Sequence, residues 1–281
     1  MGCADSKNIE VEDVACCICG LEDSELVFDL GKIKVVKCKK CGLIYNNPRC
    51  AKASLEKYYK SHYYPGDILC DAEKLLAVFR KNYHVWEKSI SQIENSLGHV
   101  GKLLDVGSGL GYFLKVAGEH GWDVIGVEPD IVAAEFARTY FKLRIITGTL
   151  QELLIKEESQ RFDVITYLQS FEHLPNPVTE LKKVASLLNP GGILFLAVPN
   201  FNYLGIKVLR GNQFNIQNQT HMYHYTYSSL CHLLRKAGFK DIRRFIYWGG
   251  GRKQFGILGQ TIQWLFRAAG ISSEIRVIAV L

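Results

Sequence analysis

Hydrophobic and polar positions from Gly101 onward alternate between two spacings. Short apolar runs predict buried strands, and the segments between them carry apolar residues at every third or fourth position, which predicts amphipathic helices. The apolar runs lie at 103–106, 122–128, 144–147, 162–168, 193–198, 241–248 and 274–281. Strands that alternate with helices at these lengths favour a largely parallel sheet with helices on both faces. The pattern therefore predicts an α/β fold.

The residues before this sheet predict one long helix. Its apolar stripe recurs in steps of three or four and ends at Gly98, a helix stop; its members are Leu75, Phe79, Tyr83, Trp86, Ile90, Ile93 and Leu97. A tyrosine-rich linker at 58–65 precedes this helix, and another amphipathic helix is expected near 255–268. The polar and aromatic stretch 201–227 has little periodicity, which favours an insert that shapes a substrate site.

The turn after the first strand of the sheet is rich in glycine. Gly107, Gly109 and Gly111 stand at alternate positions after Asp105, and a new helical pattern starts at Tyr112. Glycine allows a sharp turn and a close approach to a ligand, because no Cβ intrudes. A second acid, Glu128, closes the next apolar run, where a carboxylate can accept hydrogen bonds from ribose hydroxyls. The turn therefore predicts a nucleotide-like ligand.

These residues resemble the cofactor-binding motifs of class I S-adenosylmethionine-dependent methyltransferases, from about Tyr83 to Leu281. The segments 161–165 and 187–192 extend the resemblance. It implies a doubly wound, Rossmann-like sheet of seven strands with an antiparallel last strand, and S-adenosylmethionine as cofactor. The residues expected to bind the cofactor are Asp105, Gly107, Ser108, Gly109, Gly111, Glu128, Pro129, Gly148, Thr149, Leu150 and Gln169.

Two cysteine pairs near the N-terminus have metal-ligand spacing. Cys16-x-x-Cys19 and Cys38-x-x-Cys41 are separated by 18 residues, which is inside the range typical of zinc sites. Four thiolates close a tetrahedral shell and leave no position for water, so the predicted zinc is structural. Apolar residues at 26–28 and 33–36 predict short strands of a zinc ribbon. A ribbon in front of the methyltransferase motifs is similar to a subgroup in which some members methylate sugars or other small metabolites.

His173, just after the fourth strand of the sheet, is the expected catalytic base, because imidazole titrates near neutral pH. A histidine that packs or caps the loop is the alternative. Gln169-x-x-Glu172-His173 is similar to a metal-binding Glu-x-x-Glu-His pattern of some methyltransferases, but Gln169 removes one charged ligand. We therefore expect no catalytic divalent ion. His221 and His224 are expected to contact substrate or to pack locally.

The expected function is methyl transfer to a small hydroxylated metabolite, with a sugar or sugar nucleotide as the leading example. The formal charge of +6 is mild, but lysines at 32, 34, 37, 39 and 40 give the ribbon a basic face. An RNA substrate held by that face is the first alternative. A non-catalytic domain that binds cofactor or a partner is the second. The oligomeric state is left open.

Three parts are expected along the chain. A zinc-ribbon-like module takes residues 1–57, the aromatic linker and long helix take 58–100, and the methyltransferase domain takes 101–281 with its insert at 201–227. Because no apolar run reaches the 18 residues that span a bilayer, and because the cysteines have metal spacing, the expected compartment is the cytoplasm.

Overall fold

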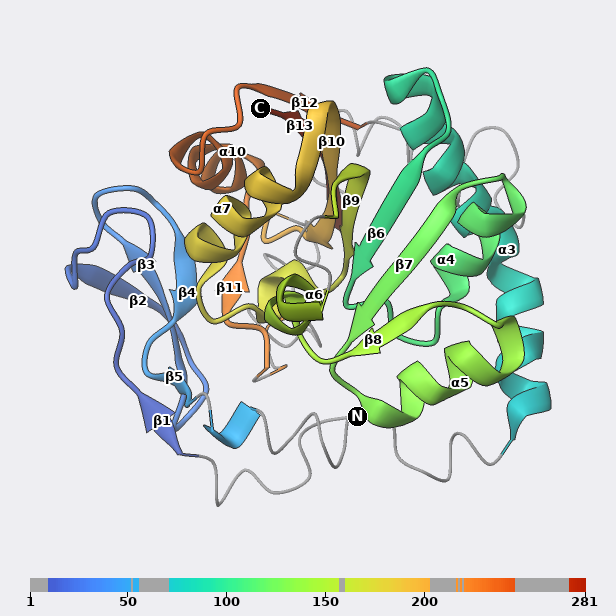
Figure 1. The fold of residues 1–281 in the computed structure, drawn as a ribbon. Helices are drawn as coiled ribbons and strands as arrows, with labels where there is room; N and C mark the ends of the chain where they lie inside the picture. Colours follow the sequence, from blue (N-terminus) through green and yellow to red (C-terminus); the bar gives the residue numbers. More distant parts are fainter. Residues whose placement is uncertain are drawn as a thin grey trace, which may run out of the picture. The chain divides into compact units, whose positions relative to one another are not determined.

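The structure is a computed structural model that describes residues 10–51, 53–55, 71–156, 160–202, 216, 218, 220–245 and 273–281 (Figure 1). The tyrosine-rich stretch 58–65, the expected helix at 255–268 and much of the insert at 201–227 lie outside the described residues. By contacts, the chain forms two compact units. We call them the ribbon unit (Met1–Leu55, Gln169–Lys182 and Leu196–Ala279) and the glycine-turn unit (Glu56–Leu168, Lys183–Phe195 and Val280–Leu281).

The main sheet has the predicted seven strands among the described residues, in the order β12-β13-β10-β9-β6-β7-β8. Its strands are β6 (Lys102–Val106), β7 (Asp123–Glu128), β8 (Ile145–Thr147), β9 (Phe162–Leu168), β10 (Leu188–Pro199), β12 (Asp241–Arg244) and β13 (Glu274–Val280). The last strand of the chain, β13, lies between β12 and β10 and is antiparallel, as predicted. Strand β6 is parallel to β7 and β9, and β7 is parallel to β8. The carboxyl ends of β6, β7, β8 and β9 therefore share one edge.

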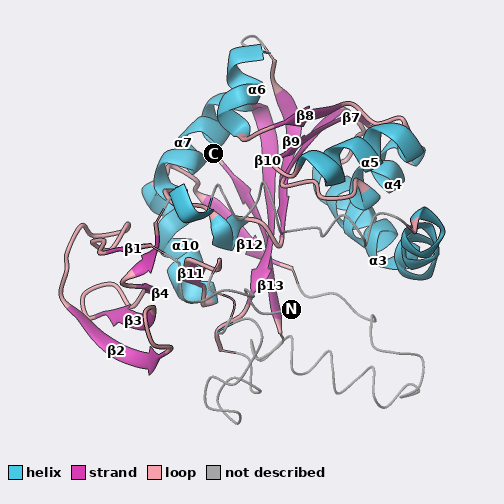
Figure 2. Cartoon of the chain, turned by 90° about the horizontal axis from the view of Figure 1, so that it is seen from below, coloured by secondary structure: helices cyan, strands magenta, loops and turns pink. Residues whose placement is uncertain are grey.

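Helices lie on both sides of the strands of the glycine-turn unit. Helices α3 (Ala72–Leu97), α4 (Tyr112–Glu119) and α5 (Ile131–Phe141) gather on one side, and α6 (Leu150–Lys156) lies on the other (Figure 2). Most apolar residues of β6, β7 and β9 are almost fully buried, as expected for strands covered on both faces. This confirms the doubly wound arrangement that the alternating pattern predicts.

The long helix α3 contains the predicted apolar stripe and ends at the predicted glycine. The Asp71 side chain accepts a hydrogen bond from the amide of Lys74, and Gly98 closes the helix in the left-handed conformation. The predicted stripe faces the protein, and Phe79 packs between the rings of Tyr112 and Phe141 at centroid distances of 5.4 and 5.1 Å. Aromatic packing therefore fixes α3 against the helices that follow β6 and β7.

Strand β10 starts five residues earlier than the sequence predicts. The segment after α7 (Pro177–Leu187) contains Pro190, Gly191 and Gly192, which favours a turn, yet Leu188–Pro199 is one strand. Asn189 donates to Asp163 of β9 at 2.7 Å, and a Cβ on Gly192 would lie 3.1 Å from the backbone oxygens of β9. Tertiary contacts with β9 therefore override the local turn preference.

The ribbon unit contains a second sheet of four strands in the order β11-β4-β3-β2. The two predicted ribbon strands are β2 (Ser24–Asp29) and β3 (Lys34–Cys38), which pair as an antiparallel hairpin, and β4 (Ile44–Asn46) extends it. The fourth strand, β11 (Tyr223–His224), comes from the predicted insert and pairs with β4. A separate pair joins β1 (Val11–Glu12) to β5 (Arg49–Cys50). The ribbon's sheet thus includes residues almost 180 positions later in the chain.

Two shorter elements complete the ribbon unit. A 3-10 helix, η1 (Phe171–His173), follows β9, and α10 (Tyr227–Lys236) begins at Thr226, which forms a capping box with Ser229. In the part of the chain that the structure describes, no helix is both long enough and apolar enough to cross a membrane.

Candidate functional site

The glycine turn after β6 has the backbone conformation that its sequence predicts. Gly107, Gly109 and Gly111 have φ values of 77°, 53° and 77°, which are accessible to glycine at little cost. The amides of Gly107 and Ser108 both donate to the carbonyl oxygen of Val127, at 2.8 and 3.1 Å. The turn is therefore tied to the end of β7.

Gly111 is needed for packing as well as for its backbone angle. A Cβ at this position would lie 2.7 Å from Leu143 Cδ1 and 2.8 Å from the Cβ of Ala137. The next residue, Tyr112, stands where a dinucleotide-binding motif would have its third glycine, and its hydroxyl donates to the Leu75 carbonyl oxygen at 2.8 Å. Tyr112 therefore anchors the long helix α3 beside the turn.

Glu128 is buried at the end of β7, and its carboxylate supports the glycine turn. One oxygen accepts from the amide of Gly109 at 2.7 Å, and the other accepts from the amide of Asp130 at 2.8 Å. Burial raises the pKa of Glu128 to about 7, although both amides lower it. Each carboxylate oxygen has a second lone pair, so Glu128 can still accept hydrogen bonds from a ligand.

Asp105 is also buried, at 2% exposure, near the end of β6. Its carboxylate accepts from the hydroxyl of Thr166 at 2.7 Å, and burial raises its pKa to about 7 against that hydrogen bond. Thr166 was not among the predicted site residues, although it is the polar residue of the β9 run and pairs in register with Asp105. Two buried carboxyls on adjacent strands give this edge of the sheet a capacity for negative charge that suits a cationic ligand.

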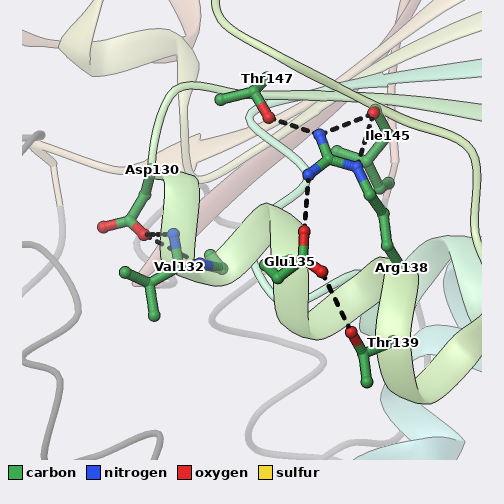
Figure 3. Close-up of polar contacts among 8 residues, drawn as sticks. Asp130, Val132, Glu135, Arg138, Thr139, Ile145 and Thr147 are labelled. Atoms are coloured by element: carbon green, nitrogen blue, oxygen red, sulfur yellow. Dashed lines mark hydrogen bonds and ion pairs between the residues drawn. The ribbon is translucent and has the colours of Figure 1, made fainter.

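The segment after β7 is held by α5. Pro129 is followed by Asp130, whose carboxylate caps α5 by accepting from the amides of Val132 and Ala133, both at 2.9 Å. At the other end of α5, the Arg138 guanidinium donates to the carbonyl oxygen of Ile145 at 2.9 Å and to the hydroxyl of Thr147 (Figure 3). These contacts fix α5 to β8 and so fix the loop that carries Glu128.

The expected cofactor-binding residues after β8 (Gly148, Thr149 and Leu150) lie at the start of α6. The Gly148 amide donates to the Glu128 carbonyl oxygen at 2.9 Å, and Glu152 accepts from the Thr149 amide at 2.7 Å. Leu150 is buried and begins α6. Ser108, another expected contact, has a buried hydroxyl close to Gly126. A Cβ added to Gly126 would lie 2.7 Å from Ser108 Oγ. The structure thus gathers ten of the eleven expected cofactor residues in the glycine-turn unit, and their contact with a cofactor stays a prediction.

Gln169, the eleventh, belongs to the ribbon unit. Its φ of 57° is unusual for a residue other than glycine, and its amide donates to the carbonyl oxygen of Ala197 at 2.8 Å. Its side chain donates to Glu274 of β13 at 2.7 Å. No local pattern in the sequence indicates the Gln169–Glu274 pair, because it joins residues 105 positions apart.

Glu172, His173 and His221 form a buried cluster in the ribbon unit. Glu172 Oε1 lies 4.0 Å from the Nε2 atoms of both histidines, and the two rings meet edge to face at 4.6 Å. Because His173 Nδ1 lies 3.0 Å from the carbonyl oxygen of Thr220, it carries the proton in the neutral ring, and Nε2 carries the lone pair. The structure thus joins His173 to Glu172, which the sequence analysis considered only as a metal ligand.

Burial gives this cluster its electrostatic character. It lowers the pKa of His173 to about 3 and raises the pKa of Glu172 to about 8. Both groups are therefore uncharged at neutral pH. His173 then has a lone pair to accept a proton, but its lowered pKa makes it a weak base unless a negative charge stabilises the imidazolium. The ligand atoms of Glu172, His173 and His221 lie within 4.8 Å of one another, a spacing that also suits a metal ion. The expectation of no catalytic metal there stays a prediction.

The four predicted zinc ligands lie together. The sulfur atoms of Cys16, Cys19, Cys38 and Cys41 are all within 4.8 Å of one another, with Cys16–Cys41 and Cys19–Cys38 each at 3.4 Å. Each pair sits on the same kind of turn: the Gly20 amide donates to the Cys16 carbonyl oxygen at 2.7 Å, and the Gly42 amide to that of Cys38 at 2.9 Å. Two matching turns and four converging thiols fit one tetrahedral ion.

Comparisons with known proteins identify the domain. A family model described as a methyltransferase domain matches residues 78–244, which is more than half of the chain. Ubiquinone biosynthesis O-methyltransferase of Coxiella burnetii (strain RSA 493 / Nine Mile phase I) is 34% identical over 119 residues, 41% of this chain and 50% of that protein. The enzyme of the same name from Aliivibrio fischeri (strain ATCC 700601 / ES114) is 34% identical over 116 residues, 39% and 49% of the two chains. The chain spans about half the length of the curated relatives it matches.

Solved structures agree on the fold. A methyltransferase from Archaeoglobus fulgidus described as SAM-dependent has a TM-score of 0.55 at 19% identity, over 78% of this chain and 99% of that chain. The plantazolicin methyltransferase BpumL, solved in complex with SAH, has a TM-score of 0.55 at 18% identity, over 80% and 93% of the two chains. The chain therefore belongs to the methyltransferase domain family and has the fold of its S-adenosylmethionine-dependent members.

Proposed function

We propose that the protein transfers a methyl group from S-adenosylmethionine to a hydroxyl of a small metabolite, with a sugar or sugar nucleotide as the leading acceptor. The observation that carries the donor assignment is Glu128, a buried carboxylate that holds the glycine turn and keeps two lone pairs for ribose hydroxyls. The relatives named ubiquinone biosynthesis O-methyltransferase support a small hydroxylated acceptor. The sugar assignment rests on the resemblance to ribbon-bearing methyltransferases.

The residues at the turn fit the donor. A close-approaching backbone at Gly107, Gly109 and Gly111 leaves room for the donor's amino-acid part, because no side chain projects there. The bound donor supplies an activated methyl group on a positively charged sulfur. An ionised Asp105 is favoured beside such a charge, which offsets the burial that raises its pKa. The turn therefore binds and orients the donor.

The cluster of Glu172, His173 and His221 supplies the acceptor chemistry in this proposal. As the acceptor oxygen bonds to the methyl carbon, the carbon–sulfur bond breaks and its electron pair returns to sulfur. The hydroxyl proton moves to His173 Nε2, the lone-pair nitrogen of the ring. Glu172, once ionised, stabilises the resulting imidazolium from 4.0 Å away. The fold of the family does not by itself assign a base. The proposed role of His173 is supported by its position beside Glu172 and His221.

The four-cysteine site in this proposal holds a structural zinc ion. Cys16, Cys19, Cys38 and Cys41 would complete its coordination shell, which would hold the β2–β3 hairpin and the turn before β4 together. The ribbon's basic face has less capacity for RNA than its lysine count indicates, because Lys37 pairs with Glu25 at 3.3 Å and Lys39 with Asp23 at 2.7 Å. These pairs favour the small-molecule acceptor.

A labelled-methyl assay tests the proposal. The zinc-loaded protein is incubated with labelled S-adenosylmethionine and with separate metabolite, RNA and protein fractions of source cells. We expect label in the metabolite fraction, unchanged by nuclease, and a loss of at least about a hundredfold in the His173→Ala variant. Label in RNA that disappears on nuclease treatment would replace the small-molecule acceptor with the RNA alternative.

A further inference from the structure

The predicted zinc ribbon and the histidine cluster share one sheet. Strand β11 pairs antiparallel with β4, with Tyr223 opposite Tyr45 and His224 opposite Ile44. His221 lies two residues before β11, and both strands belong to the ribbon unit. The ribbon therefore supplies β4, the strand that pairs with β11. We call residues 221–224, which include His221 and His224, the histidine segment.

Two of the four cysteines lie at the turn between β3 and β4. Cys38 is the last residue of β3, and Cys41 comes three residues before Ile44, the first residue of β4. The Cys38 amide donates to the Leu43 carbonyl oxygen at 2.9 Å, which closes the turn between the two strands. A metal ion bound by Cys38 and Cys41 would hold this turn, whereas four uncoordinated thiols exert no comparable restraint.

Asn46, the last residue of β4, holds the histidine segment at three points. Its backbone amide donates to the Met222 carbonyl oxygen at 3.0 Å, and its side-chain amide donates to the His221 carbonyl oxygen at 2.8 Å. Its side-chain oxygen lies 3.0 Å from His224 Nε2. Because that oxygen can only accept, the ring of His224 must donate through Nε2. Asn46 is 1% exposed, so each of these hydrogen bonds is shielded from water.

The same segment contacts Glu172. The Met222 amide donates to the Glu172 backbone oxygen at 2.9 Å, and His221 Nε2 lies 4.0 Å from its carboxylate. Arg49 of β5 adds a second tie, since it donates to the Pro175 carbonyl oxygen at 2.8 Å. A continuous set of contacts thus runs from the cysteine turn through Asn46 to His221 and Glu172.

We infer that Asn46 is a positioning residue through which the four-cysteine zinc site sets the orientation of His221 against Glu172 and His173. Zinc loading then controls the acceptor step and leaves methyl-donor affinity within twofold, because all of the expected donor contacts except Gln169 belong to the glycine-turn unit. This inference deepens the proposed function and rests on it for the acceptor step. The coupling between the metal site and the histidines can be measured without any methyl-transfer assay.

The test compares Asn46→Ala and Asn46→Asp with Lys34→Ala, a control at an exposed position of the same sheet. Full-length, zinc-loaded protein labelled with ¹⁵N-histidine gives imidazole resonances, which are assigned by single histidine replacements. In Asn46→Ala we expect shifted His221 and His224 signals, unchanged metal content, S-adenosylmethionine affinity within twofold of wild type, and about a tenfold to hundredfold fall in kcat. Lys34→Ala should match the wild type in histidine signals, metal content, S-adenosylmethionine affinity and kcat.

Asn46→Asp separates the two side-chain contacts and serves if the alanine variant does not fold. It keeps an acceptor oxygen for His224 but places a second oxygen against the His221 carbonyl, so the hydrogen bond to His224 is retained while the one to His221 is lost, and the His221 signal should shift in both variants. Stepwise removal of zinc with a chelator should shift the His221 imidazole resonance in proportion to the metal lost. The S-adenosylmethionine affinity should stay within twofold of that of the zinc-loaded protein.

Two results would overturn the inference. The first is histidine signals that are unchanged both in the Asn46 variants and on loss of metal. The second is a donor affinity that falls in proportion to the zinc content. Histidine shifts without methyl transfer to any fraction would contradict the proposed function and would support the coupling.

Discussion

Replacing Glu128 with Gln is the most informative change at the donor turn. Both carboxylate oxygens accept backbone hydrogen bonds, from the amides of Gly109 and Asp130. Glutamine has one acceptor oxygen and one NH₂ donor, so in either orientation its NH₂ faces a backbone N–H. A buried donor left without a partner costs about 1–3 kcal/mol.

A second effect opposes this loss of stability. The pKa of Glu128 rises from 4.5 to about 7 on folding, so above pH 7 the buried charge lowers the free energy of unfolding by about 3 kcal/mol, at 1.36 kcal/mol for each pH unit. Glutamine removes that charge. The two effects nearly cancel at pH 8, and we expect the melting temperatures of Glu128→Gln and wild type to lie within a few degrees of each other.

Donor affinity has no such compensation. A hydrogen bond to a charged acceptor contributes about 1.5–3 kcal/mol, so the loss of one from a ribose hydroxyl should weaken S-adenosylmethionine binding by about tenfold to hundredfold. Isothermal titration calorimetry at pH 8 measures this. Glu135→Gln, at an exposed position of α5, is the control and should bind like the wild type. An affinity of Glu128→Gln within twofold of wild type would refute the assignment of Glu128 to the ribose.

Three further predictions follow from the same geometry. Donor affinity of the wild type should rise from pH 6 to pH 8 as Glu128 and Asp105 ionise through their pKa values of about 7, and calorimetry of Glu128→Gln should show a smaller rise, because only Asp105 is then left to ionise. Gly111→Ala should lower the free energy of unfolding in urea by about 2–4 kcal/mol, from positive φ and a tight Cβ, whereas Gly118→Ala in α4 should cost nothing. The rate of methyl transfer should rise toward pH 8 as Glu172 loses its proton, because a carboxylate then faces the protonated His173, and Glu172→Gln should be slower with a flat profile. A Gly111→Ala variant as stable as wild type, or an unchanged profile in Glu172→Gln, would contradict these arguments.

Local sequence patterns predicted the elements that depend on local physics. The period of apolar residues located α3 and the seven strands of the main sheet, although β10 starts earlier than predicted and β12 ends at Arg244 instead of at Trp248. The glycines of the turn were recognisable because Gly111 has both a positive φ and no room for a Cβ. The cysteine spacing likewise identified four thiols that converge in space.

Contacts between distant residues left no such pattern. Strand β11 has two residues, too few for any periodicity, and its pairing with β4 joins residues almost 180 positions apart. Asn46 stands among ordinary polar loop residues in the sequence, so its contacts with His221 and His224 were not foreseen. Glu172 was visible only as part of a short motif, and its proximity to His221 depends on tertiary structure.

The most direct test of the account follows the methyl group itself. Zinc-loaded protein with methyl-labelled S-adenosylmethionine should place label in a small hydroxylated metabolite, and the yield should fall by about tenfold or more in Glu128→Gln at donor concentrations below the dissociation constant. Label in RNA or protein instead, or donor binding without transfer to any fraction of source cells, would contradict the account.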